Sequence, residues 1–454
     1  MAKKDKSLVL LNNSLARLVR KQDYFKKFNS LWDWIFQENE SVVDSEIKYL
    51  EYIKNVIIKK YWNQDIYISP ASLDDIIFYV IQNFNQNEIL DKIDDFVKKS
   101  GLHKNSVVIF PLHSFGFKYG GLGHLLGRQN ISFKHKEFQI FTQTNSFDKS
   151  VNNIISYLDD IKLPNRKKLD KSLFKHFHDS RHLSWFERNP IMVLHFKFSQ
   201  QERFDNLRFI IQKINFITNK LYFLSALANI DDKTGSAFST RNTNNWETLD
   251  IKHFLTVTTS KNASTLNCIP VHFSNFMIYE KMHMNIDLLI KRKSNKRWEA
   301  KAIDSIDNLY SGYMKYRLTN EKQYSKYYRI ANSLDYFRRS IKSINKEDKV
   351  INLNIAFESL LLDRQESKKK EKMLERLWLA LKGKITKKKN LENFKNVITE
   401  RNEIIHNGVP STAELDFADI NRTYCKFILF LNDNINHIDS TEDNYLTKFY
   451  TNFT

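Results

Sequence analysis

Residues 390–410 of the chain read NLENFKNVITERNEIIHNGVP, and this stretch decides the fold of the C-terminal part. Apolar side chains recur in it at steps of three and four residues, which predicts a helix with one apolar face formed by Phe394, Val397, Ile398, Ile404 and Ile405. Gly408, followed by Pro410, predicts the point at which this helix ends. We therefore expect a helix that packs against other helices.

One position of this apolar face carries a charge. Arg401 lies four residues after Val397 and three before Ile404, and its guanidinium keeps its charge, so it needs a partner or an anionic ligand. Asn402 and His406 are four residues apart and share a neighbouring stripe. The carbonyl end of the helix favours the protonated imidazole of His406. A permanent cation near a titratable imidazole predicts a phosphate site with an acid–base group.

A second helix, predicted over residues 350–362, offers an acidic partner. Glu358 is the single acidic residue of its apolar face, whose other members are Ile351, Ile355, Leu361 and Leu362. Because Glu358 and Arg401 are each the lone charge in an apolar stripe of the same predicted bundle, we expect them to face each other. The pair is either a structural buried ion pair or part of a polar pocket in which Glu358 orients Arg401 or contacts substrate.

Bulk composition favours a globular protein with an anionic partner. The 454 residues predict two or three domains. A net charge of +19 favours nucleic acid before a membrane surface, although a Lys-rich composition also serves solubility. Cys268 and Cys425 are too few for a disulfide framework or a cysteine zinc site, and no apolar run approaches the roughly 20 residues that span a bilayer. We expect a cytoplasmic protein that does not bind membranes.

The pattern along the chain predicts an α+β fold that is mostly helical. A mixed N-terminal region, residues 1–240, is divided into a helical part over 1–100 and a mixed part over 101–240. Strands are expected within 107–110, 131–141, 191–198 and 253–259. A connecting segment over 241–295 leads to an all-helical bundle over 296–438 and a C-terminal tail over 439–454.

Two stretches of the N-terminal region hold further candidate chemistry. Six of the ten glycines lie in residues 101–127, but the stretch lacks both the Gly-Lys-Ser/Thr end of a P-loop and a GxGxxG followed by an acid. A structural turn or partner-binding loop is the simpler interpretation, beside nucleotide binding. Four potential metal ligands crowd together: His176, His178, Asp179 and His182. Their spacing fits no metal motif, so surface or core histidines are the simpler interpretation.

Basic residues crowd the segment just before the opening helix. Residues 382–389 contain no acid and include Lys382, Lys384, Lys387, Lys388 and Lys389. Such a run is either a solvated loop or a set of phosphate contacts that adds salt-dependent affinity for nucleic acid.

Three segments together resemble a HEPN domain of the Apea-like type: INLNIAFESLLLD at 351–363, ERLWLAL at 375–381 and RNEIIHNG at 401–408. The signature of that family is Arg, four to six residues, then His, often with a polar residue directly after the Arg. Arg401, Asn402 and His406 fit this signature, with four residues between the Arg and the His. The resemblance covers about residues 296–438.

The resemblance implies a metal-independent endoribonuclease that uses no cofactor and works as a homodimer, in which the two motif helices meet across a cleft. Many such proteins act as toxins in bacterial abortive infection and antiviral defence, and cut tRNA or another RNA once a trigger is sensed. Here the N-terminal region would be the sensor and a phage-derived protein the trigger. The alternative is a non-catalytic HEPN module that dimerises and binds RNA or a protein.

The resemblance also implies residue roles. His406 would be the acid–base group when a ribose 2′-hydroxyl attacks the adjacent phosphate and leaves a 2′,3′-cyclic phosphate. Arg401 would bind that phosphate, and Asn402 would hold the imidazole or a phosphate oxygen. Glu358 would set Arg401. RNA-binding lysines would be Lys384, Lys387, Lys388 and Lys389.

Overall fold

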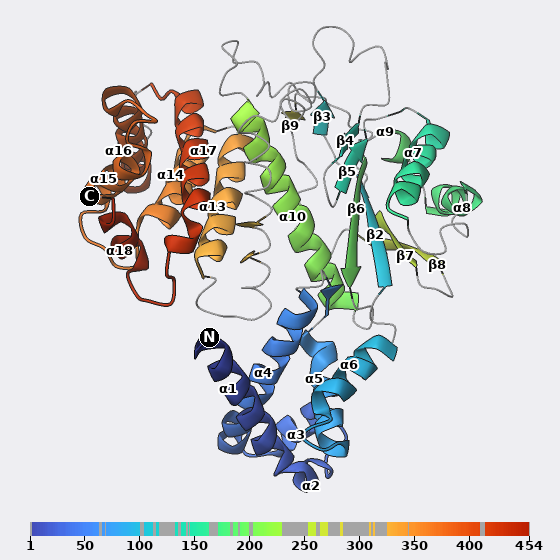
Figure 1. Cartoon of the computed structure of the whole chain (residues 1–454). Helices are drawn as coiled ribbons and strands as arrows, with labels where there is room; N and C mark the ends of the chain where they lie inside the picture. Colours follow the sequence, from blue (N-terminus) through green and yellow to red (C-terminus); the bar gives the residue numbers. More distant parts are fainter. Residues whose placement is uncertain are drawn as a thin grey trace.

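The structure, a computed structural model, describes residues 2–62, 66–68, 70–99, 104–111, 115–117, 132–134, 138–141, 144, 146–162, 171–181, 185–188, 191–198, 203–228, 253–259, 264–270, 282–284, 308–309, 312–313, 325–343, 345–408 and 414–453. This part of the chain is mostly helical with a small sheet, which confirms the expected mostly helical α+β fold (Figure 1). None of its helices combines the length and the apolar character that crossing a membrane requires.

The N-terminal helices pack around a core of their own. They are α1 (Ala2–Val19), α2 (Gln22–Phe25), α3 (Leu31–Gln37), α4 (Glu40–Trp62), α5 (Pro70–Asn83) and α6 (Ile89–Lys99). Leu11, Leu15 and Leu18 form the buried stripe of α1 at helical spacing. Ser30 caps α3 by accepting from the Asp33 amide. The buried residues of this unit form a cluster separate from that of the rest of the protein.

The sheet follows the N-terminal helices and has the strand order β4-β5-β6-β2-β7-β8. Its strands are β2 (Lys104–Pro111), β4 (Ser132–Lys134), β5 (Phe138–Phe141), β6 (Ile191–Phe198), β7 (His253–Thr259) and β8 (Ser264–Pro270), and the two-residue β1 (Ile66–Tyr67) pairs with β6 in parallel. The central strand β2 pairs in antiparallel fashion with β6 and β7. Its continuous apolar run is buried, as expected of a strand covered on both faces.

Two details of the sheet differ from expectation. Residues 131–141, expected as one strand, contain the antiparallel pair β4 and β5, in which Ser132 lies opposite Phe141. Residues 241–295 were expected as a connection with one strand at 253–259, and that strand is β7; the unexpected element is β8, which pairs with β7 and extends the sheet. Two short strands, β3 (Phe115–Phe117) and β9 (Met282–Met284), pair separately in parallel.

One long helix joins the sheet to the C-terminal helices. α7 (Phe147–Asp160), α8 (Lys171–Arg181) and α9 (Trp185–Arg188) lie on one side of the sheet, and α10 (Arg203–Ala228) lies between the sheet and the C-terminal bundle (Figure 1). The described side chains of α10, at residues 213–223 and 226–227, are nearly all buried, including Phe216, Leu221 and Phe223. The sheet and the bundle consequently share one apolar core.

The C-terminal bundle consists of α13 (Ser325–Lys342), α14 (Lys346–Leu361), α15 (Lys369–Leu381), α16 (Glu392–Asn407), α17 (Phe417–Asp433) and α18 (Tyr445–Thr451). Phe357 of α14 lies at its centre, with ring centroids 4.5 Å from Phe394 and 5.3 Å from Tyr424. Residues 439–454, expected as a tail, include α18, whose Leu446 and Phe449 are buried in the bundle.

Candidate functional site

The helix expected from residues 390–410 is α16, and it ends where the sequence predicts. Gly408 adopts a left-handed conformation with φ of +70°, and its N–H donates to the Ile404 carbonyl at 3.0 Å. Phe394, Val397 and Ile398 are buried as expected. Ile405 is 48% exposed instead, because the last turn of α16 extends past the core that covers the earlier turns.

Arg401 lies half-buried on the inner side of α16. Its Nη1 donates to Oδ1 of the adjacent Asn402 at 3.1 Å. Its Nε is buried and has no hydrogen-bond partner among the residues that the structure describes, nor does Arg401 form an ion pair with any of them. The guanidinium is therefore partly desolvated and keeps unused donors, which is a suitable state for contact with an anionic group.

His406 is exposed in the last turn of α16. Positions five apart on a helix differ by about 140° around the axis, so His406 and Arg401 leave the helix in different directions. Asn402 lies between them, bonded to Arg401 and one turn before His406. In a single chain the three motif residues thus lie at one helix end, but their side chains do not point toward a common ligand position.

Glu358 does not pair with Arg401. Its carboxylate accepts from Lys369 Nζ at 3.1 Å and from Asn354 Nδ2 at 3.4 Å. The contacts of Phe357 with Phe394 and of Lys346 with Glu400 show that α14 and α16 run in opposite directions.

This register explains why the expected contact is missing. Arg401 lies seven residues after Phe394, about 10 Å farther along the helix and away from the end of α14 that carries Glu358. The sequence pattern places Glu358 and Arg401 on apolar helix faces, but it does not give this offset along the axes. The offset depends on how the two helices pack.

Two buried polar residues beside the motif were not singled out from the sequence. Glu400 is fully buried and forms an ion pair with Lys346 of α14 at 2.8 Å. Asn354 is 2% exposed, and its Oδ1 has no hydrogen-bond partner within the described ranges. The signal for Asn354 was present in the sequence, because it lies between Leu353 and Ile355 and one turn before Glu358.

The candidate RNA-binding lysines lie at the other end of α16. Lys384 and Lys389 are exposed, and residues 387–391 form a π-helical turn that leads into the helix; the side chains of Lys387 and Lys388 fall outside the described part. From Lys389 to His406 the chain covers seventeen residues of helical geometry, which corresponds to about 25 Å. These lysines and the imidazole therefore cannot contact the same phosphate.

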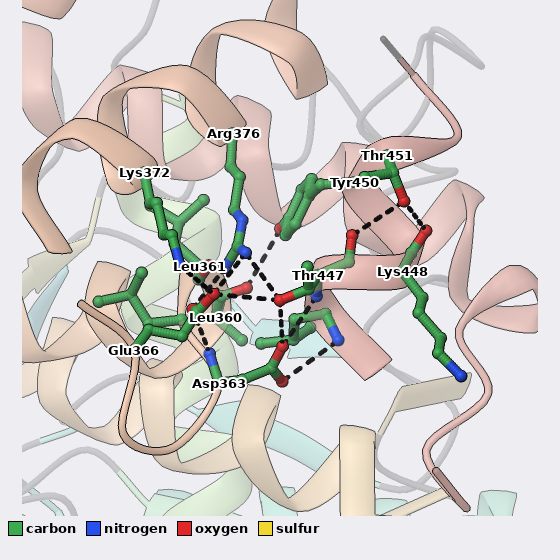
Figure 2. Close-up of polar contacts among 12 residues, drawn as sticks. Leu360, Leu361, Asp363, Glu366, Lys372, Arg376, Thr447, Lys448, Tyr450 and Thr451 are labelled. Atoms are coloured by element: carbon green, nitrogen blue, oxygen red, sulfur yellow. Dashed lines mark hydrogen bonds and ion pairs between the residues drawn. The ribbon is translucent and has the colours of Figure 1, made fainter. Parts of the chain in front are cut away.

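A second polar cluster fixes α18 to the bundle (Figure 2). Arg376 of α15 donates to both carboxylate oxygens of Glu366 at 2.7 Å and to Thr447 Oγ1 at 2.8 Å. Asp363 accepts from the Leu446 and Thr447 amides at the start of α18. The polar groups of this cluster are hydrogen-bonded to one another. The cluster therefore stabilises the position of α18 and offers no free group to a ligand.

Burial by itself would raise the pKa of Glu366, but hydrogen bonds from Arg376, from the Asp363 amide and from Lys372 outweigh it. They lower the pKa of Glu366 to about 2. The carboxylate is therefore charged throughout the range in which the protein is expected to work.

The remaining candidate motifs are only partly described. Of residues 101–127 the structure describes β2 and β3, and the rest of the glycine-rich stretch lies outside it. His178 contacts Asp179 at 3.0 Å and packs its ring against Phe147, while His176 is exposed and His182 is outside the described residues. No three potential metal ligands come together in the described ranges.

A small cavity between α13, α14, α17 and α18 is lined by none of the candidate residues; its walls include Lys326, Arg329, Leu360 and Tyr445. In comparisons with known proteins, no protein family, no curated protein and no solved structure matches this chain.

Proposed function

We propose that the chain is a metal-independent endoribonuclease of the HEPN type, with its site at the C-terminal end of α16. The observation that carries this proposal is the placement of Arg401, Asn402 and His406 together on that helix end, with a partly desolvated guanidinium and an exposed imidazole. The excess of basic residues, a net charge of +19, supports an RNA substrate.

The chemistry follows from these groups. His406 accepts the proton of a ribose 2′-hydroxyl, whose oxygen then bonds to the adjacent phosphorus. The bond from phosphorus to the 5′-oxygen breaks, and that oxygen takes up a proton, which leaves a 2′,3′-cyclic phosphate and a 5′-hydroxyl. Arg401 stabilises the charge that develops on the phosphate oxygens, and its bond to Asn402 limits where the guanidinium can point.

The role proposed for Glu358 changes with its contacts. Because its carboxylate is engaged by Lys369 and Asn354, it acts on α14 and the start of α15. Glu358 therefore has no part in orienting Arg401 in the proposed mechanism.

A homodimer fits the divergence of Arg401 and His406 on one chain. Two copies that meet through their α16 ends would bring each imidazole toward the other copy's guanidinium. Ile405, exposed between these residues, offers an apolar contact for such a meeting. In this scheme the N-terminal region senses a phage-derived protein, and tRNA is the RNA that is cut.

The test is RNA-end sequencing after expression of wild type, His406→Ala and Arg401→Ala. Wild type should generate new 2′,3′-cyclic phosphate ends, also when the purified protein is assayed in EDTA, and both variants should generate none. His437→Ala is the matched control, because His437 is likewise exposed and follows a helix of the bundle. Ends that persist in both motif variants, or that vanish on chelation, would rule the mechanism out.

A non-catalytic RNA-binding module is the second candidate. It is favoured by one observation, that Arg401 and His406 leave α16 about 140° apart. This function predicts that wild type retains RNA and that sequencing finds no new ends in either wild type or His406→Ala.

A further inference from the structure

The exposed face of α16 carries a row of polar side chains that ends at His406. Its members follow at steps of four, three and four residues and are Lys395, Thr399, Asn402 and His406. Thr399 and His406 are exposed, and the other two are partly exposed. The row is therefore a surface that an extended ligand could follow to the imidazole.

A cation from a neighbouring helix is brought onto this row. Lys370 lies in the first turn of α15, and its Nζ donates to Thr399 Oγ1 at 3.0 Å. The Thr399 hydroxyl donates in turn to the Lys395 carbonyl at 2.9 Å, which leaves its oxygen free to accept from Lys370. Lys370 is thus anchored over the row by a neutral group.

Among the described residues, a carboxylate engages the charge of three lysines near Lys370 but not that of Lys370 itself. Lys346 pairs with Glu400, Lys369 with Glu358 and Lys372 with Glu366. Lys370 forms no ion pair with any carboxylate in the described part of the chain, so its ammonium remains available to an external anion.

The position of Lys370 suits a phosphate close to the reacting one. Thr399 precedes His406 by seven residues, which is about 10 Å along the helix. This distance is too long for one phosphate to reach both groups, but it is short enough for neighbouring phosphates of one RNA strand. The lysines before α16, about 25 Å from His406, could contact only a more distant part of that strand.

We propose that Lys370 binds a backbone phosphate beside the one that is cut, with the RNA strand lying along the row from Lys395 to His406. This inference rests on the proposed ribonuclease function. Lys395 adds less, because Glu392 already pairs with it at 3.0 Å. Lys370 is a substrate-binding residue that positions the strand and takes no part in proton transfer.

The experiment measures RNA binding by the full chain carrying His406→Ala, so that the RNA stays intact. A fluorescein-labelled single-stranded RNA of mixed sequence is titrated by anisotropy over a series of KCl concentrations. Adding Lys370→Gln should weaken binding and reduce the slope of log K against log [KCl] by about 0.7, the value for one phosphate contact on a single strand. Adding Lys370→Arg, which keeps the charge, should restore the slope of the parent.

The matched control is Lys448→Gln, which removes an exposed lysine from α18 and should leave the slope unchanged. An equal loss in the Lys370 and Lys448 variants, or an unchanged slope in Lys370→Gln while the parent binds, would overturn the phosphate contact and leave the ribonuclease proposal standing. A parent that binds no RNA, together with a wild type that cuts none, would overturn both.

Discussion

At the scale of single residues, Glu366 and Arg376 show how a buried ion pair affects the free energy of unfolding. Their side chains are 8% and 7% exposed, and two parallel hydrogen bonds at 2.7 Å join them. Such a pair adds stability only if its remaining donors and acceptors are also used. Here Thr447, Lys372 and the Leu361 carbonyl use them, so removing either partner would leave a buried charge without compensation.

The lowered pKa of Glu366 predicts a specific acid dependence. The group has an ordinary pKa of 4.5 and one of about 2 in the folded protein, so the stability that its charge contributes is complete above pH 4.5 and is lost as the pH falls toward 2. Glu366→Gln should therefore lower the free energy of unfolding by about 3 kcal/mol at neutral pH, and the difference from wild type should shrink between pH 4.5 and 2.

Urea unfolding at several pH values, followed by near-ultraviolet circular dichroism, measures this difference. Glu442→Gln is the control, because Glu442 forms an exposed pair with Lys448, and it should change stability by less than about 1 kcal/mol. Wild-type and Glu366→Gln curves that run parallel down to pH 2 would contradict the explanation.

At this scale, local geometry could be predicted from the sequence and partners could not. The left-handed end at Gly408 depends on the residue itself and its near neighbours, and it was found. The partner of Glu358 depends on how α14 and α16 are offset along their axes, and that offset is set by Phe357 and Phe394 packing together. The periodicity of a sequence predicts which face of a helix a residue lies on. It does not predict where along the helix axis that residue meets a neighbouring helix.

At the scale of elements, α18 depends on a residue outside it. Its own N-cap position, Asn444, adopts a left-handed conformation and makes no capping bond. Asp363 takes that role instead by accepting from the Leu446 amide at 3.2 Å and the Thr447 amide at 2.8 Å. A seven-residue helix is marginal by itself, so this cap and the burial of its apolar face hold it in place.

Removing the cap should loosen α18 locally. Asp363→Ala leaves two amides without acceptors and should cost about 1 to 2 kcal/mol, which corresponds to hydrogen exchange of the Leu446 and Thr447 amides about tenfold faster. Exchange measured by mass spectrometry or NMR tests this. Asp439→Ala, which removes an exposed carboxylate in the preceding loop, should leave those rates unchanged. Unaltered exchange in Asp363→Ala would show that packing alone holds α18.

Long periodic helices were therefore predictable, and short elements were not. The stripes of α4, α10 and α13 carry enough apolar residues for the period to be clear. α18 is only seven residues long and receives its cap from 83 residues away, so the sequence of residues 439–454 was interpreted as a tail. β4 and β5 read as one strand because the short pair shares a single alternating run.

At the scale of the whole molecule, residues 1–99 differ from the rest of the chain in net charge and have an apolar core of their own. Residues 1–99 contain fifteen Lys and Arg and fifteen Asp and Glu, so the net charge of +19 belongs entirely to residues 100–454. The same N-terminal residues enclose their own apolar core, whereas the sheet and the C-terminal bundle share another. Under the proposed function, the charge that attracts RNA would therefore belong to the larger part.

The separate core predicts that residues 1–99 fold alone. The isolated fragment should show a helical circular dichroism spectrum and one cooperative thermal transition, because its buried side chains contact one another and not the second core. It should also fail to bind the labelled RNA at low salt, while the full chain binds it. An unfolded fragment would show that these helices depend on the sheet to which β1 pairs.

The sheet and the C-terminal helices cannot be separated in the same way into fragments that fold alone. α10 contributes side chains to the apolar core that the sheet and the bundle share. A protease that cut α10 would therefore expose a large apolar surface on each fragment, and both fragments would aggregate. A shortened version of this protein would therefore have to keep α10 intact, together with the elements that pack around it.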